Sequence, residues 1–151
     1  MRIINGIDEL KIVVGEHLGY SDWVEVTQER VNQFAEATGD HQWIHVDISR
    51  AMEESPFGGT IAHGYLMLSL IPTLVRQVYR IDRLKMIVNY GANKVRFPSP
   101  VPVGSRVRAG VEILSAETKG ESTQLTSRIT IEREGSDKPV CVAETVAVAF
   151  I

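Results

Sequence analysis

The segment from Gly64 to Tyr79 constrains the fold of this chain more than any other, because it is apolar on nearly all sides. Its apolar residues are Tyr65, Leu66, Met67, Leu68, Leu70, Ile71, Leu74, Val75 and Val78. A helix without a polar face is normally buried, so the rest of the chain must cover it. The segment contains no Asp or Glu, and Pro72 is expected to kink the helix or to end it early.

The second half of the chain has the two-residue alternation of β-strands, which supplies this cover. We expect strands over residues 86–97, 106–114, 122–132 and 139–151. The dry face of the second strand consists of Val107, Ala109, Val111 and Ile113. The last strand is apolar on both faces, which favours a central position, and its smaller side chains would let a helix approach closely. The patterns predict an α+β architecture, an antiparallel sheet around one buried helix, in a single domain over residues 1–151.

Two helices before the apolar segment hold a short polar stretch between them. Thr27 is a suitable N-cap for a helix that follows a strand over residues 20–26, and Gly39 is a suitable residue to end it. Asp47 is the expected cap of a second short helix. Residues 40–45 are therefore expected in the loop between the two helices.

Asp40, His45 and Gly64 together offer the groups needed for proton transfer beside a carbonyl. A carboxylate and an imidazole can hold one water between them, and the first amides of a helix can face a developing negative charge. Each residue also has a structural interpretation, as a turn Asp, a packed His and a Gly that relieves crowding. His63 is expected to brace the loop, and the other two histidines are expected on the surface.

Composition excludes several classes of function. The net charge of -3, from 16 basic and 19 acidic side chains, gives no general attraction to nucleic acid or to an anionic membrane. No apolar run approaches the roughly 20 residues that span a bilayer. The single cysteine, Cys141, lies in an apolar run and cannot form an internal disulfide, so a cytoplasmic protein is expected. The histidines show no ligand spacing, so neither a metal nor a redox cofactor is expected.

Three motifs, in this order, resemble the MaoC-like (R)-specific enoyl-CoA hydratases. They are Ala37-Thr38-Gly39-Asp40-His41-Gln42-Trp43-Ile44-His45, then Gly59-Thr60-Ile61-Ala62-His63-Gly64, then Asn89-Tyr90-Gly91 with Lys94-Val95-Arg96-Phe97. The resemblance covers residues 20–151. It implies a hot-dog fold, in which the sheet wraps a long central helix, and a homodimer whose sheets join edge to edge. Such pairing would cover an exposed edge strand.

The resemblance also implies an activity, the reversible syn hydration of trans-2-enoyl-CoA to (R)-3-hydroxyacyl-CoA by a hydro-lyase. Asp40 and His45 would activate the water that adds to C3, while a proton reaches C2 on the same face. The Gly64 N–H would face the thioester oxygen. Coenzyme A would enter only as part of the substrate, and acyl carrier protein is an alternative carrier.

The loop between Asp40 and His45 departs from the family, whose members often have Asn-Pro where this chain has Gln42-Trp43. Trp43 is expected either to narrow the acyl pocket or to pack against the scaffold.

A weaker candidate for binding the substrate lies in the strands. Lys94 and Arg96 share one face of a strand, and with Arg106 and Arg108 on the next strand they could grip coenzyme A phosphates. A solvated sheet face is the commoner explanation. Glu144 interrupts the last apolar strand and is expected at a sheet edge or beside an arginine.

Two other functions stay open. Many hot-dog acyl-CoA thioesterases use a carboxylate on the central helix, but residues 64–79 contain none. A non-catalytic acyl-thioester-binding subunit of a heterodimeric dehydratase is the other alternative, and the presence of both Asp40 and His45 argues against it. Hydration and dehydration are one reaction in two directions, so the residues do not assign its sense, nor the preferred acyl length.

Overall fold

The computed structural model describes residues 1–151, which form five helices and eight strands. The helices are α1 (Gly6–Ile12), α2 (Gln28–Thr38), α3 (Trp43–Val46), α4 (Ile48–Glu54) and α5 (Gly64–Val78). The strands are β1 (Arg2–Asn5), β2 (His17–Tyr20), β3 (Val24–Glu25), β4 (Tyr79–Asp82), β5 (Met86–Arg96), β6 (Arg106–Lys119), β7 (Ser122–Arg133) and β8 (Cys141–Phe150).

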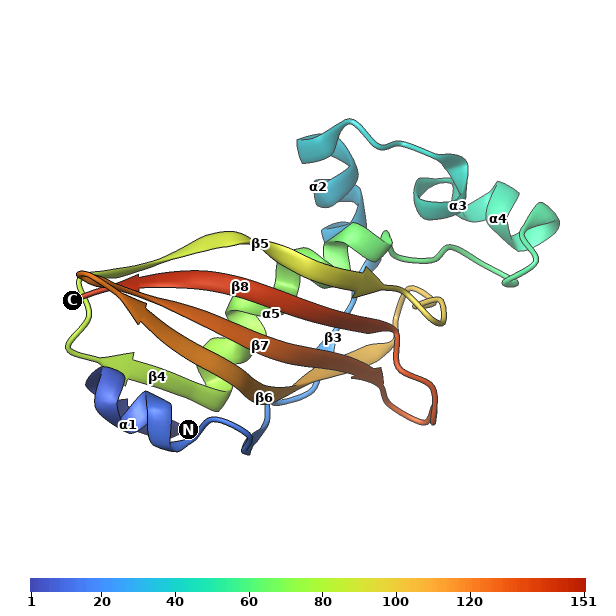
Figure 1. Ribbon diagram of the computed structural model, residues 1–151. Helices are drawn as coiled ribbons and strands as arrows, with labels where there is room; N and C mark the ends of the chain where they lie inside the picture. The colour runs from blue at the N-terminus through green and yellow to red at the C-terminus, as the bar shows by residue number, and fades with distance from the viewer.

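The main sheet is antiparallel and curves around α5 (Figure 1). Its strand order is β2-β6-β7-β8-β5, with β3 also paired to β6, so β5 forms one edge. The last strand, β8, lies inside the sheet as expected. A small parallel pair, β1 with β4, is separate from this sheet. The predicted α+β architecture, a sheet around one long helix, is confirmed.

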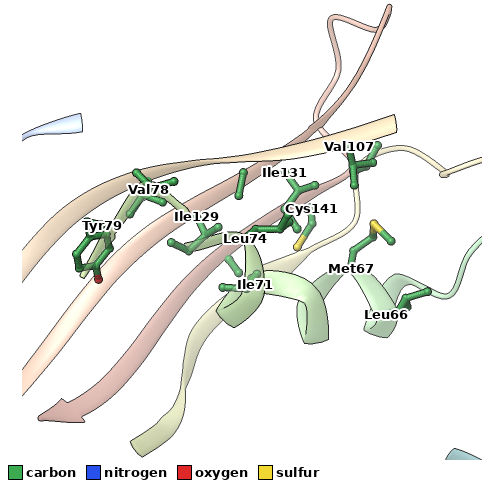
Figure 2. Packing of buried hydrophobic residues seen from close by; sticks show 14 of the residues in the cluster. Leu66, Met67, Ile71, Leu74, Val78, Tyr79, Val107, Ile129, Ile131 and Cys141 are labelled. Atoms are coloured by element: carbon green, nitrogen blue, oxygen red, sulfur yellow. The ribbon is translucent and has the colours of Figure 1, made fainter. Parts of the chain in front are cut away.

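The core lies between α5 and the concave face of the sheet, where Leu66, Met67, Ile71 and Leu74 meet strand residues such as Ile129 and Cys141 (Figure 2). The predicted dry face of β6 is fully buried at all four positions. Burying one such aliphatic side chain contributes about 1.5 to 3 kcal/mol. The small residues of β8 at the core, Cys141 and Ala143, leave room for the helix, and burial raises the pKa of the Cys141 thiol to about 11.

The helices α2, α3 and α4 gather at one end of the molecule, near the N-terminus of α5 (Figure 1). Their predicted caps are confirmed. Thr27 Oγ1 accepts from the Arg30 N–H at 3.2 Å, and Asp47 Oδ1 accepts from the Arg50 N–H at 3.1 Å. Gly39 ends α2 in the left-handed region, at φ 77°. The chain therefore turns sharply just before Asp40.

Several details differ from the expectations. The strand expected over residues 20–26 is not continuous, because β2 ends at Tyr20 and β3 covers only Val24–Glu25. Between them, Ser21 pairs with Ala109 through its backbone N–H and also accepts the Ala109 N–H with Oγ, each at 2.9 Å. His45 lies on the one-turn helix α3, within the stretch expected to be a loop. Pro72 lies inside α5 without ending it. None of the helices is both long enough and apolar enough to cross a membrane.

Candidate active site

His45 is a buried side chain whose ring is fixed by one hydrogen bond. Only 7% of the residue is exposed, and its Nδ1 lies 2.7 Å from the carbonyl oxygen of Ile61. Because a carbonyl oxygen can only accept, Nδ1 carries the proton and Nε2 keeps its lone pair. The fold therefore selects the tautomer in which Nε2 is the basic atom.

The environment of His45 also keeps its ring neutral. Burial lowers the pKa of His45 below its ordinary value of 6.5. The hydrogen bond to Ile61 opposes this, the neighbouring His63 lowers the pKa further, and Asp40 raises it, so that the net shift is downward. At neutral pH the imidazole is accordingly ready to accept a proton.

His63 ties the two candidate catalytic residues together. It is 3% exposed and lies at the N-cap position of α5. Its Nε2–H donates to the backbone carbonyl of Asp40 at 3.0 Å, and its ring stacks on His45 with centroids 3.9 Å apart. On α2, Phe34 contacts the same ring, at 4.9 Å between centroids. These contacts agree with the bracing role expected for His63.

Asp40 lies on the solvent-facing side of the candidate site, where 51% of its side chain is exposed. Its carboxylate oxygen Oδ2 lies 4.0 Å from His63 Nε2. One carboxylate oxygen of Asp40 and one ring nitrogen each of His45 and His63 all lie within 4.8 Å of one another. The structure thus brings together Asp40 and His45, with one group facing solvent and the other buried. This arrangement can hold a water between a carboxylate and a neutral imidazole.

A shared metal ion would need a free nitrogen from each histidine. The His63 nitrogen nearest to Asp40 is Nε2, which carries the proton donated to the Asp40 carbonyl. The other nitrogen, Nδ1, is buried and has no hydrogen-bond partner. The two rings are also nearly parallel, at 25°, so their in-plane lone pairs do not converge. This geometry suits proton transfer better than chelation.

Gly64 is the first residue of α5, as expected, and the ring of Phe97 lies against it. A Cβ at Gly64 would lie 2.8 to 3.0 Å from three atoms of that ring, closer than real contacts allow. Tyr65 in turn meets Phe97 edge-on, with ring centroids 5.9 Å apart. Crowding by Phe97 therefore favours glycine here, and as the first residue of α5 Gly64 has an N–H without a partner inside the helix.

A groove of about 810 Å³ runs between α5 and strands β5, β7 and β8. It begins at Leu68 and Ser69, about one turn after Gly64, and extends to Tyr79 and Arg80 beyond the other end of the helix. This groove is not among the sites predicted from the sequence. A signal was present, because Leu68, Pro72 and Val75 share a face of α5 that differs from the core face.

Trp43 lies outside this groove. The Arg50 guanidinium carbon lies 4.2 Å from the Trp43 ring centroid, so the indole packs against α4. Of the two roles expected for this residue, the structure shows the scaffold contact.

The expected four-cation cluster is wrong, because the strand next to β5 is β8 rather than β6. Lys94 and Arg96 lie in a separate hollow of about 330 Å³ with Arg128, Val142 and Glu144. The other two cations are paired on β6, where Arg106 binds Glu134 and Arg108 binds Glu132. The structure does not bring Lys94 or Arg96 to the Asp40–His45 pair.

Glu144 belongs to a row of alternating charge that crosses four strands. In register, the row is Glu112, Arg128, Glu144 and Lys94. Only the first pair is in hydrogen-bond contact, with Arg128 donating to Glu112 at 2.8 Å. Opposite charges at facing positions stabilise a sheet modestly. Of the expected substrate cations, only Arg96 lacks a facing carboxylate, since it pairs in register with Val142.

Known proteins resemble this chain in sequence and in fold. Residues 10–134 match the MaoC-like domain family. The chain is 54% identical over 147 residues to 3-hydroxyacyl-thioester dehydratase Z of Mycobacterium tuberculosis, covering 97% of each protein. The (R)-hydratase of A. caviae superposes with a TM-score of 0.68 at 26% identity, covering 89% of this chain and 94% of that one.

A second solved structure, a monoamine oxidase regulatory protein from Archaeoglobus, superposes with a TM-score of 0.80. It covers 99% of this chain and 96% of its own, and at 23% identity it supports the fold alone. The expectations of a hot-dog fold and of a hydro-lyase are confirmed. The family match over residues 10–134 and the 54% identity to a 3-hydroxyacyl-thioester dehydratase show that this chain belongs to the MaoC-like dehydratase family.

Proposed function

We propose that this protein catalyses the reversible, (R)-specific hydration of trans-2-enoyl thioesters to 3-hydroxyacyl thioesters, with coenzyme A as part of the substrate. The observation that carries the proposal is the fixed tautomer of His45, which makes Nε2 the basic atom of a ring that has a nitrogen within 4.8 Å of an Asp40 carboxylate oxygen. The names of two relatives, a 3-hydroxyacyl-thioester dehydratase and an (R)-hydratase, support the same reaction.

In the hydration direction, Asp40 and His45 hold the water. His45 Nε2 takes one proton from it as the water oxygen bonds to C3 of the enoyl group. The electrons of the double bond move towards C2 and the thioester oxygen, and the pair returns a proton to C2 on the same face. An acid or base in this role typically contributes about 100- to 10,000-fold to the rate.

The start of α5 provides a place for the thioester. The Gly64 N–H, at the positive end of the helix dipole, would stabilise the charge on the thioester oxygen. The acyl chain would then continue along α5 into the groove that begins at Leu68. A groove of about 810 Å³ is within the usual size range of small-molecule sites.

Thioester hydrolysis is the less supported alternative, because α5 carries neither Asp nor Glu. Sulfur chemistry at Cys141 is also disfavoured, since the thiol is buried and its pKa is raised. Acyl-carrier-protein substrates remain part of the proposal, because the reacting atoms would be the same.

The assembly we propose is a homodimer formed along β5. This strand forms one edge of the sheet, and all but one of its residues are exposed. Four of its exposed side chains are large and apolar, Met86, Ile87, Val88 and Tyr90. A long apolar edge strand is a surface that proteins normally cover, and a second copy of the same edge is a suitable cover.

The test is an ultraviolet assay that follows loss of the conjugated thioester absorbance of crotonyl-CoA and of a longer 2-enoyl-CoA. Wild type is compared with Asp40→Asn, His45→Gln and a matched control, His41→Gln, which alters an exposed histidine of the same loop. We expect an (R)-3-hydroxyacyl product, loss of turnover in the first two variants and full activity in the control. Release of free thiol would instead indicate a thioesterase, and acyl-CoA binding without turnover would indicate a binding subunit.

A further inference from the structure

Gln28, the first residue of α2, uses its whole side-chain amide in contacts that lead to His45. Its Nε2 donates to the His45 backbone carbonyl at 2.8 Å and to Asn32 Oδ1 at 2.9 Å. Its Oε1 accepts from the Thr60 hydroxyl at 2.6 Å. One side chain thereby joins α2, α3 and the segment before α5.

These contacts fix the two chain segments that determine the orientation of the His45 ring. The first is the backbone of His45, whose carbonyl accepts from Gln28. The other is the segment of Thr60, because the next residue, Ile61, supplies the carbonyl that accepts the His45 Nδ1–H. The Ile61 N–H also donates to the Ile44 carbonyl at 3.0 Å. A shift of Thr60 relative to His45 would therefore change the hydrogen bond from His45 Nδ1–H to the Ile61 carbonyl, which fixes the tautomer.

We propose that Gln28 is a positioning residue for the base His45, acting through the His45 carbonyl and the Thr60 hydroxyl. The inference rests on the proposed function for the base role of His45. The positioning of the His45 ring by these hydrogen bonds does not depend on that function, because the bonds would fix the ring in any reaction. Thr60 is only 8% exposed, so its hydroxyl depends on a protein partner.

The polarity of the amide makes the inference testable. Gln28→Glu keeps the shape of the side chain but removes both donors, so a carboxylate oxygen would face the His45 carbonyl. Gln28→Met keeps the approximate length and removes all the bonds. Gln33→Glu adds the same charge to an exposed position of α2 at which no side-chain hydrogen bond is formed, and it serves as the matched control.

In the enoyl-CoA assay we expect kcat to fall about 10- to 100-fold in both Gln28 variants, with KM within about twofold of wild type. Gln33→Glu should match wild type. Thr60→Val should reduce kcat, Thr60→Ser should retain it, and the double variant Gln28→Met with Thr60→Val should lose no more than the worse single variant. Additive losses would overturn the inference, because the two residues would then act independently.

The second readout does not depend on activity. The imidazole nitrogens of the four histidines can be followed by ¹H–¹⁵N NMR over a pH titration, with His45→Gln to assign His45. We expect His45 to be the Nδ1–H tautomer in wild type and a mixture of tautomers in Gln28→Met. In Gln28→Glu, the midpoint of the His45 titration should lie at a higher pH, because of the added negative charge.

Unchanged His45 signals in both Gln28 variants would overturn the inference, even if the melting temperature falls. A wild-type protein that shows no hydratase activity would instead contradict the proposed function, while the NMR result would still decide the role of Gln28.

Discussion

A histidine works as a base only when it is neutral and presents the right nitrogen, and here groups outside the imidazole set both conditions. Burial makes the charged ring costly, and the Ile61 carbonyl fixes the proton on Nδ1. Neither condition can be read from the motif that contains His45. The motif gives the residue types and their spacing, whereas the tautomer depends on a carbonyl sixteen positions further along the chain.

The acid side of the pH profile follows from the same burial. Protonated His45 has no lone pair at Nε2, so kcat/KM should fall as the pH drops through its pKa. Because burial lowers that pKa, half-maximal kcat/KM is expected below pH 6.5. The measurement is kcat/KM for crotonyl-CoA between pH 4.5 and 8, with substrate stability checked at each pH. A midpoint above 6.5 would mean that the charge of Asp40 outweighs burial.

Gly64 can be tested for two roles at once. Gly64→Ala would push a methyl into the Phe97 ring, at a cost of about 1 kcal/mol, since Phe97 is 39% exposed and can give way. We expect activity to fall at least about 10-fold as well, because the methyl would also obstruct the thioester at the amide. The measurements are the free energy of unfolding and kcat/KM.

The double variant Gly64→Ala with Phe97→Ala separates the two causes. It removes the clash, so its free energy of unfolding should match that of Phe97→Ala alone, while kcat/KM should stay low. Recovery of activity together with stability would show that Gly64 is needed only to accommodate Phe97.

Among the elements, those with local signals were predictable and those with distant partners were not. Thr27 and Gly39 bound α2 because capping is decided within a few residues. The alternation in β6 is equally local, since the polarity of each side chain indicates which face of the strand it occupies. By contrast, β1 pairs with β4, which begins at Tyr79, and four-residue strands so far apart leave no pattern in either segment.

The mistaken cation cluster has the same origin. The alternation along β5 correctly places Lys94 and Arg96 on one face, but it does not say which strand lies beside it. Consecutive long strands often pair, yet here β5 pairs with the last strand of the chain, so β7 and β8 separate it from β6. Sheet order, not residue chemistry, removed Arg106 and Arg108 from the candidate site.

The end of α2 makes a prediction at this scale. Gly39→Ala would force an L side chain into the left-handed region at φ 77°, which costs about 1 to 2 kcal/mol. We expect kcat to fall too, because the strain can be relieved by moving Asp40, the next residue. Gly135→Ala is the matched control, since Gly135 has the same φ and equally open surroundings in the turn between β7 and β8.

Both variants should lower the melting temperature by similar amounts, and only Gly39→Ala should lower kcat. Equal activity in the two would mean that the Asp40 loop tolerates the strain, so the turn would not be needed to position the carboxylate.

At the scale of the whole molecule, the candidate site lies where three separate parts of the fold meet. Asp40 and His45 come from the segment of helices α2 to α4 and Gly64 from the start of α5, while Phe97 directly follows the edge strand β5. The strand β5 is exposed along nearly its whole length and also lines the groove. A second copy of the chain bound to β5 would therefore cover the surface beside the groove. Assembly and substrate binding are thus expected to be coupled.

The dimer proposal gives the last prediction. Val88→Lys with Tyr90→Lys places two charges on the apolar edge of β5, where burial in an interface would be costly. We expect wild type to sediment as a dimer and the double variant as a folded monomer, with the same far-ultraviolet circular dichroism but reduced activity. Ile12→Lys, on the exposed face of α1, is the control and should remain dimeric. If the double variant is still a dimer, the interface lies elsewhere than β5. If wild type is a monomer, the homodimer proposal is wrong, and β5 would instead pair with a different chain, as in a heterodimer.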